Sequence, residues 1–301
     1  MLQTVPQTLF DRSLARARLE RGASVAAARA GADFLLKRAT GELLERLSLI
    51  KRNFAIALDL GTPGPHAARA MSAGGNFGFV AQAAPIRAGL GGADLARLVA
   101  DEERLPIADV SCDLVVSLLA LQGVNDLPGV LIQARRALRP DGLFMACVMG
   151  GDSLNELRQS LTIAEIEIRA GASPRVAPFA DVRALGGLLQ RAGFALPVVD
   201  LDRAVVRYGD MIALMRDLRA MGATNALNAR SRTLLRRDVL RRAGQVYAER
   251  FADPDGRLRA TFDMVWLSGW APHESQPRPL KPGSARMRLE DALKVAGGKA
   301  K

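Results

Sequence analysis

Residues 55–70, AIALDLGTPGPHAARA, carry the strongest structural signal in the chain. An apolar run ends at Asp59 and Leu60, a turn rich in Gly and Pro follows, and a helix-forming run begins at His66. A buried parallel strand passes into a helix in this way, and the backbone N–H groups at the start of the helix then face a ligand. The stretch therefore predicts an α/β fold with a binding site after this strand.

The turn itself departs from the usual spacing of a nucleotide-binding loop, which is D-x-G-x-G-x-G. Asp59, Gly61 and Gly64 are small or acidic as such a loop requires, but Pro63 and Pro65 stand where its second and third glycines would fall. Proline fixes φ and has no N–H to donate. We therefore expect a loop that is stiffer and poorer in hydrogen-bond donors than one that holds a nucleotide.

From residue 54 onward, short apolar runs alternate with helix-forming runs. The strands predicted in this part follow the first one at Phe77–Gln82, Cys112–Ala120 and Leu143–Met149, with a further short strand or helix near residues 93–98. A helix is expected at Leu127–Leu138, ended by a turn at residues 139–142, RPDG. This alternation predicts a doubly wound, mostly parallel sheet of the Rossmann-like type with right-handed crossovers.

The regions outside this alternation predict the remaining domain organisation. Leucines recur near helical spacing between Phe10 and Leu49, so residues 1–50 are interpreted as an N-terminal helical arm and residues 51–205 as the Rossmann-like core. Residues 206–285 are interpreted as a helical and strand elaboration of the same domain, and residues 286–301 as a flexible tail. Predicted elements of the second half are a helix at Ser153–Arg169 that starts with a capping box, helices at Asp210–Met221 and Ser231–Phe251, and a strand at Thr261–Trp270.

The formal net charge of +11 comes mainly from arginine. One interpretation is an acidic partner surface, either nucleic acid or anionic lipid. We favour the other, in which the arginines cover the solvated faces of helices, because they are spread along the chain without an aromatic stacking platform. No apolar run reaches the length of about 20 residues that crosses a bilayer. The two cysteines lie in apolar segments, which favours a reducing, cytoplasmic location and argues against a metal site.

Ligands of an open α/β sheet lie beyond the carboxyl ends of its strands. After the second strand, residues 82–84 offer no carboxylate that could hold two ribose hydroxyls. Asp101 and Glu102 come after the third strand, where a carboxylate can accept a hydrogen bond from an adenine amino group. Leu119 comes at the end of the fourth strand.

Residues 101–161 resemble the class I S-adenosylmethionine-dependent methyltransferases. Within them they are most similar to the branch of mitochondrial complex I assembly factor 5 and its bacterial relatives, near the malonyl-carrier-protein methyltransferases. Further matches are the segments FDR at 10–12, GGDSLNELR at 150–158, MGATN at 221–225 and HESQ at 273–276. The resemblance implies a class I methyltransferase fold across nearly the whole chain.

The resemblance also implies which residues would hold S-adenosylmethionine. Asp59, Gly61 and Gly64 correspond to the first motif, Asp101 and Glu102 to the adenine-contacting motif, and Leu119 to a position that packs on the cofactor. Three features depart from the family pattern: the two prolines of the loop, the missing ribose acid, and Gln122-Gly123 in place of a His-Trp pair. A degenerate cofactor site is therefore expected.

No residue is assigned to catalysis from the sequence, but three are candidates. His273 lies in a polar cluster of a Pro-rich segment, and Asp152 and Glu156 lie four residues apart, where they can bind a guanidinium or simply belong to a capped helix. Three functions stay open. They are methyl transfer, hydroxylation of an arginine in a respiratory NADH dehydrogenase subunit, and cofactor-free binding of a complex subunit or assembly factor, in the bacterial cytoplasm or at the periphery of the inner membrane.

Overall fold

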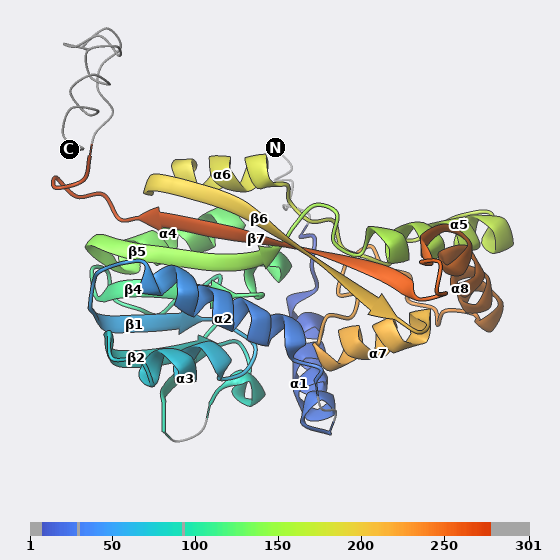
Figure 1. The fold of residues 1–301 in the computed structure, drawn as a ribbon, viewed down its shortest axis with the longest axis horizontal. Coiled ribbons are helices and arrows are strands. Elements are labelled where there is room, and N and C mark those ends of the chain that lie inside the picture. Colours follow the sequence, from blue (N-terminus) through green and yellow to red (C-terminus); the bar gives the residue numbers. More distant parts are fainter. Residues whose placement is uncertain (1–7, 29–30, 92–93, 278–301) are drawn as a thin grey trace, which may run out of the picture.

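The computed structural model describes residues 8–28, 31–91 and 94–277, which form a seven-stranded sheet in the order β3-β2-β1-β4-β5-β7-β6 (Figure 1). All neighbours from β3 to β5 pair in parallel, whereas β7 is antiparallel to both β5 and β6. The predicted doubly wound, mostly parallel sheet is confirmed. The strands are β1 (Phe54–Leu60), β2 (Phe77–Ala84), β3 (Ala96–Val99), β4 (Cys112–Leu118), β5 (Leu138–Met149), β6 (Ala195–Tyr208) and β7 (Leu258–Trp270).

Several helices, α4, α6 and α7 among them, begin after an aspartate whose side chain caps the first turn. Asp126, Asp181 and Asp210 each accept a hydrogen bond from the backbone N–H three residues later. These caps fix where α4, α6 and α7 start. The helices are α1 (Arg12–Ala28), α2 (Phe34–Ser48), α3 (His66–Ser72), α4 (Leu127–Ala137), α5 (Asn155–Arg169), α6 (Val182–Arg191), α7 (Met211–Ala220) and α8 (Arg237–Phe251).

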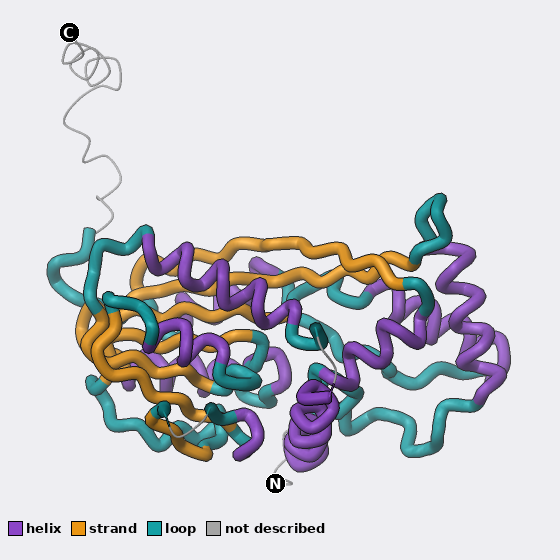
Figure 2. The backbone as a smooth tube through the Cα atoms, turned by 60° about the horizontal axis from the view of Figure 1, so that its bottom comes forward, coloured by secondary structure: helices purple, strands orange, loops and turns teal. Residues whose placement is uncertain are grey.

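The sheet separates two hydrophobic cores, and helices lie against both of its faces (Figure 2). On one face Ala57 of β1 belongs to a core with α2 and α3, and on the other face Leu58 and Leu60 belong to a core with α4 and α6. Burial on both faces explains why the central strands are continuous apolar runs rather than alternating ones.

The C-terminal half extends the same core instead of forming a separate one. Strand β7 lies between β5 and β6, and the long strands β6 and β7 run out to a group of helices, α5, α7 and α8 (Figure 1). Buried side chains of these helices share a core with Trp266 of β7 and with α2. Strand β6 runs from residue 195 to 208. It therefore crosses the boundary that the sequence predicts at residue 205, between the Rossmann-like core and its C-terminal elaboration.

The predicted helix start at Ser153 is wrong. Helix α5 begins at Asn155, after Leu154 in a left-handed conformation with φ of 56°. The Ser153 hydroxyl does not cap the helix, because it accepts a hydrogen bond from the Asp263 N–H at 2.9 Å and donates to the Asp263 carbonyl oxygen at 3.3 Å. A tertiary contact with β7 has therefore replaced the expected capping box.

Other element boundaries also differ from the prediction. The helical arm is divided into α1 and α2, and α8 begins at Arg237 rather than at Ser231. The expected turn at residues 139–142 belongs to β5, next to a shift in register between Cys112 and Leu114 of β4. The tail at 286–301 lies outside the described residues.

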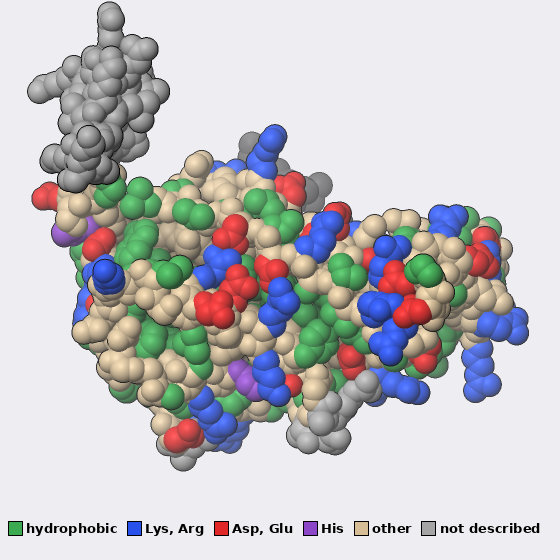
Figure 3. Space-filling model, in the orientation of Figure 1, with side chains coloured by type: hydrophobic (Ala, Val, Ile, Leu, Met, Phe, Trp, Pro, Cys, Tyr) green, Lys and Arg blue, Asp and Glu red, His purple; other side chains and the backbone are tan. Residues whose placement is uncertain are grey.

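Basic and acidic side chains alternate over much of the face shown in Figure 3. Many of the arginines are paired with carboxylates, for example Arg38 with Asp202 and Arg242 with Glu167. This agrees with the interpretation of the arginines as solvated helix faces. Among the described helices, none combines the length and the apolar character that a membrane span requires.

Candidate functional site

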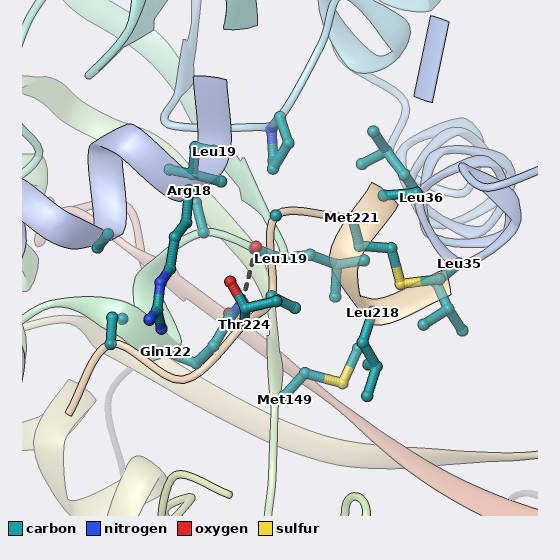
Figure 4. Close-up of a pocket in the computed structure, with 18 of the residues that line it drawn as sticks. Arg18, Leu19, Leu35, Leu36, Leu119, Gln122, Met149, Leu218, Met221 and Thr224 are labelled. Atoms are coloured by element: carbon teal, nitrogen blue, oxygen red, sulfur yellow. Dashed lines mark hydrogen bonds between the residues drawn. The ribbon is translucent and has the colours of Figure 1, made fainter. Parts of the chain in front are cut away.

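A cavity of about 990 Å³ opens at the carboxyl ends of β1, β2, β4 and β5. Helices α1, α2, α5 and α7 also contribute to its lining, together with residues in the range 175–179 and residues 221–226, which follow α7 (Figure 4). Its volume lies at the upper end of the range of about 300–1,000 Å³ for sites that bind small molecules. The predicted edge of the sheet therefore does carry a cavity.

The loop after β1 uses most of its polar backbone groups internally. Gly61 and Gly64 both have positive φ, +77° and +84°, which glycine adopts without strain. The Gly61 N–H donates to the Ala83 carbonyl oxygen at 2.7 Å, and the Gly64 N–H to the Gly89 carbonyl oxygen at 3.2 Å. Because Pro63 and Pro65 have no N–H, the loop is poor in donors, as the sequence predicts.

Gln82 of β2 closes the side of this loop with its amide group. Its Nε2 donates to the carbonyl oxygens of Gly64 at 2.7 Å and Gly89 at 3.1 Å, and its Oε1 accepts from the Gly91 N–H at 2.8 Å. Gln82 itself does not line the cavity, and the lining residue of this strand is Ala84, which has no polar side chain. The end of β2 therefore holds no carboxylate for two ribose hydroxyls.

Arg12 of α1 occupies the two carboxylates predicted to contact an adenine. Its Nη2 lies 2.9 Å from Asp101 Oδ1 and 2.5 Å from Glu102 Oε2, and Arg16 also pairs with Asp101. Burial raises the pKa of Glu102, and Arg12 offsets only part of this rise. For Asp101, burial is outweighed by the Glu103 N–H and the Arg12 guanidinium, so the pKa is lowered.

Glu102 also lies directly against the glycine loop. A Cβ atom placed on Gly61 would come within 2.9 Å of Glu102 Oε1 and 3.0 Å of Ala120 Cβ. The space beside Gly61 is thus filled by a side chain of the protein.

Asp59 is fully buried and lies outside the cavity lining. Neither carboxylate oxygen has a hydrogen-bond partner by distance and angle among the described residues. Burial raises the pKa of Asp59 to about 7, although the Thr62 hydroxyl and the Ala68 N–H act against this shift. The structure thus places Asp59 behind the loop, next to Thr62 and Ala68 and not at the cavity.

Two leucines of the lining adopt left-handed backbone conformations that L-residues rarely take. Leu119, at the end of β4, has φ of 53°, and Leu154, before α5, has φ of 56°. Such strain is held in place only by the surrounding structure and often occurs at binding sites. The structure places Leu119 in the cavity lining.

The structure does not bring the three catalytic candidates together. Asp152 pairs with Arg203 at 2.8 Å, and Glu156 is buried and accepts hydrogen bonds from the Thr261 N–H and hydroxyl. Neither residue lines the cavity. Both carboxylates tie the start of α5 to strands β6 and β7.

His273 lies at the opposite edge of the sheet. It follows β7, whose last residue, Trp270, pairs with Leu143 near the start of β5. Its Nδ1 lies 2.7 Å from the Ser275 hydroxyl, and Gln276 of the same turn donates to Asp141. Four of the six predicted cofactor residues line the cavity, namely Gly61, Gly64, Glu102 and Leu119.

Sequence reasoning missed the residues that α1 and the segment after α7 contribute. These are Arg18 of α1 and Thr224 of the segment after α7, which lie with Gln122 near one end of the cavity in Figure 4. The two segments meet at Gly22 and Gly222, where a Cβ on Gly22 would lie 2.5 Å from the Gly222 nitrogen. Residues 221–225, MGATN, form a motif that is visible in the sequence, but no local pattern indicates that this segment faces α1.

The polar groups described above do not fit an adenosyl cofactor. The loop offers few donors, the end of β2 offers no carboxylate, and Asp101 and Glu102 are bonded to arginines. Within the described ranges, no group of three or more His, Cys, Asp or Glu side chains could hold a metal ion.

Comparisons with known proteins place these features in a family. A family model for a methyltransferase domain matches residues 68–146. Over 298 residues the chain is 39% identical to "Arginine-hydroxylase NDUFAF5, mitochondrial" of Homo sapiens, covering 97% of this chain and 86% of that protein. The Danio rerio protein of the same name is 36% identical, covering 95% of this chain and 90% of its own length.

A second group of relatives is named malonyl-acyl-carrier-protein O-methyltransferase. The Methylovorus protein is 35% identical over 294 residues, covering 92% of this chain and 97% of its own length. Among solved structures, the YcgJ protein of Bacillus subtilis has a TM-score of 0.54 at 13% identity, covering 78% of this chain and 99% of that one. The "putative methyltransferase" of Bacillus halodurans has the same TM-score of 0.54 at 14% identity, covering 77% of this chain and 98% of that one. Together with the methyltransferase-domain match, this likeness shows that the fold is that of the class I methyltransferases.

Proposed function

This chain belongs to the methyltransferase-fold family that includes arginine-hydroxylase NDUFAF5, and we propose that it serves the assembly of a respiratory NADH dehydrogenase as a protein-binding factor, without S-adenosylmethionine as its working cofactor. The observation that carries this proposal is the internal pairing of the groups that would otherwise hold the cofactor. Arg12 occupies Asp101 and Glu102, and Gln82 is bonded to the loop backbone.

The energetic consequence is a large loss of affinity. Each hydrogen bond that a buried ligand group fails to make costs about 1–3 kcal/mol. Two such losses weaken binding by about 2–6 kcal/mol, which is about 30-fold to 20,000-fold, since about 1.4 kcal/mol corresponds to a factor of ten. The absent donors of the loop and the absent carboxylate on β2 are two independent losses.

Calorimetric titration with S-adenosylhomocysteine tests the absence of a working cofactor. We expect no saturation below millimolar ligand for the wild-type chain. A restored variant carrying Pro63→Gly, Pro65→Gly and Ala84→Asp regains two donors and one carboxylate, so it should bind more tightly. Saturable micromolar binding by the wild-type chain would contradict the proposal.

The role in assembly is tested in cells that lack the chain. We expect less assembled NADH dehydrogenase without it. Mass spectrometry of the enzyme's subunits should show no modification that depends on the chain. A chain-dependent gain of about 14 Da would show methyl transfer and contradict the proposal.

The names of the relatives favour a second candidate, hydroxylation of an arginine in a partner protein. This reaction inserts one oxygen atom into a C–H bond. With dioxygen as oxidant, the other oxygen atom leaves as water and a reductant supplies two electrons. A chain-dependent gain of about 16 Da on an arginine would select this candidate over simple binding.

A further inference from the structure

The cavity has a polar end and an apolar end. Figure 4 shows Arg18, Gln122 and Thr224 toward one end and aliphatic and sulfur-containing side chains toward the other. The apolar end is lined by Leu35, Leu36, Met149, Leu218 and Met221. A ligand that fills both ends must carry a polar group on an apolar body.

The charged groups of the lining are unequally paired. Its acids are Asp33, which pairs with Lys37 at 3.0 Å, and Glu102, which pairs with Arg12. Arg175 points its guanidinium to the buried carboxylate of Glu165. Arg12, Lys37 and Arg175 thus each pair with a carboxylate of the protein. Arg18 is a further cation of the lining, and one of its nitrogens has no such partner among the described residues.

Nη1 of Arg18 is buried and has no hydrogen-bond partner in the part of the chain that the structure describes. Burial lowers the pKa of Arg18, and the nearby cations Arg230 and Arg21 lower it further, against a weaker effect of Asp11. Asp11 itself is bonded to Arg230 and to the start of α1. A half-buried guanidinium whose Nη1 is buried without a partner favours an anionic group from outside the chain.

Gln122 contributes an unpartnered hydrogen-bond acceptor to the same end of the cavity. Its Nε2 donates to the Leu119 carbonyl oxygen at 2.7 Å, which fixes the orientation of the amide. Its Oε1 is buried and lacks a donor among the described residues. The polar end therefore presents one donor that needs an anion and one acceptor that needs an N–H or O–H.

We propose that this cavity binds an apolar α-amino-acid unit, either free or N-acylated as at the C-terminus of a peptide. Its carboxylate pairs with Arg18, its N–H donates to Gln122 Oε1, and its side chain enters the chamber formed by the leucines and methionines. An α-amino acid is a small unit that joins a carboxylate, an adjacent N–H and an apolar side chain. This site goes beyond the proposed function and does not depend on it.

The test uses the full chain and measures binding by calorimetry. The probes are N-acetyl-L-phenylalanine, free L-phenylalanine and N-acetyl-L-phenylalaninamide, which lacks the carboxylate. We expect saturable binding of at least one of the two acids. The amide should bind about 10- to 100-fold more weakly than the acetylated acid, since hydrogen bonds to charged groups are among the stronger ones. Binding of the acetylated acid alone assigns the site to a peptide end, and tighter binding of the free amino acid assigns it to a small molecule.

The variant Arg18→Met tests the role of the guanidinium. It should weaken binding of the acid by the same 10- to 100-fold and leave binding of the amide unchanged. Because it removes a half-buried guanidinium with an unpartnered nitrogen, its thermal unfolding midpoint should not fall below that of the wild type. Arg21→Met is the matched control, since Arg21 is exposed on the same helix, and it should bind like the wild type.

Three results would overturn the proposal. They are equal affinity for acid and amide, unchanged affinity of Arg18→Met, or no binding of either acid at millimolar concentration. Binding of S-adenosylhomocysteine alone, lost in Arg18→Met, would also overturn it, because the carboxylate would then belong to an adenosyl amino acid. That result is separable from the assembly role, which the cellular experiment measures.

Discussion

Asp59 is a carboxyl group that the fold buries completely. Its pKa of about 7 lies above the ordinary value of 3.8, because burial disfavours the charged form. Below about pH 4 both the folded and the unfolded chain hold this proton. Between about pH 4 and pH 7 only the folded chain holds it, so the free energy of unfolding falls as pH rises. Above about pH 7 both states are ionised and the fall ends.

Asp59→Asn should remove this pH dependence. Relative to the wild type, we expect the variant to gain about 2–3 kcal/mol in free energy of unfolding between about pH 5 and pH 8. Urea unfolding of both proteins at the two pH values gives the result. A difference between the proteins that stays constant with pH would show that Asp59 ionises normally in the folded chain.

Arg12 neutralises two carboxylates that the fold brings close together. Glu102 is 3% exposed, so its charge has little access to water. Arg12→Met leaves this carboxylate buried without its partner, and the variant should lose about 2–4 kcal/mol in free energy of unfolding. Denaturant unfolding measures the loss.

The double variant Arg12→Met with Glu102→Gln is the control for this prediction. It removes the carboxylate charge together with its partner, so it should recover a large part of the lost stability. If single and double variants are equally unstable, the contribution of Arg12 comes from packing of its aliphatic stem rather than from its charge.

Among the elements, α1 depends on one close backbone contact. A Cβ on Gly22 would lie 2.5 Å from the nitrogen and 2.6 Å from the Cα of Gly222. Backbone cannot move aside easily, so Gly22→Ala should lower the free energy of unfolding by about 1–3 kcal/mol. Gly41→Ala is the matched control, because no atom lies within 4 Å of its Cβ position in α2.

The control should behave in the opposite way. Alanine favours a helix over glycine by about 0.5–1 kcal/mol, so Gly41→Ala should unfold at a higher urea concentration than the wild type. Equal effects of the two substitutions would mean that α1 does not pack on the segment after α7 as described.

The same contact shows where prediction from the sequence ends. The strands were predictable because β1 and β4 are buried on both faces and appear as unbroken apolar runs. The stiff loop was predictable because Pro63 and Pro65 restrict it locally. The pairing of Arg12 with Asp101 joins residues that are 89 positions apart, and many other arginines offer the same chemistry. Which arginine pairs with a distant carboxylate depends on how α1 packs. Gly22 allows this packing, but a glycine at this position does not predict it.

The prediction of a capping box from local sequence spacing was also wrong, because a distant strand provides the hydrogen-bond partners instead. Ser153 and Glu156 have the spacing of a capping box, yet both side chains bond to β7. A hydrogen bond in a buried environment contributes more than one at an exposed helix end, so the tertiary contact prevails. Arg18 gave no signal at all, because its importance arises only from burial.

At the scale of the whole molecule, the C-terminal half completes the sheet of the N-terminal half. Strand β6 pairs with β7 from Ala195 opposite Trp270 to Tyr208 opposite Leu258, and β7 also pairs with β5. A chain that ends at residue 209 keeps β6 but loses β7, so one edge of β5 has no partner strand. Both hydrophobic cores also become exposed, because Trp266 belongs to one of them and Leu267 to the other.

We expect this truncated chain to aggregate or to unfold without a cooperative transition, because an apolar strand edge is left unpaired. The full chain, by contrast, should show one transition by both circular dichroism and tryptophan fluorescence. Adding residues 210–301 as a separate chain should restore a cooperative transition, since that fragment supplies β7 again. Cooperative unfolding of the truncated chain alone, at nearly the stability of the full one, would mean that residues 8–209 form an independent domain.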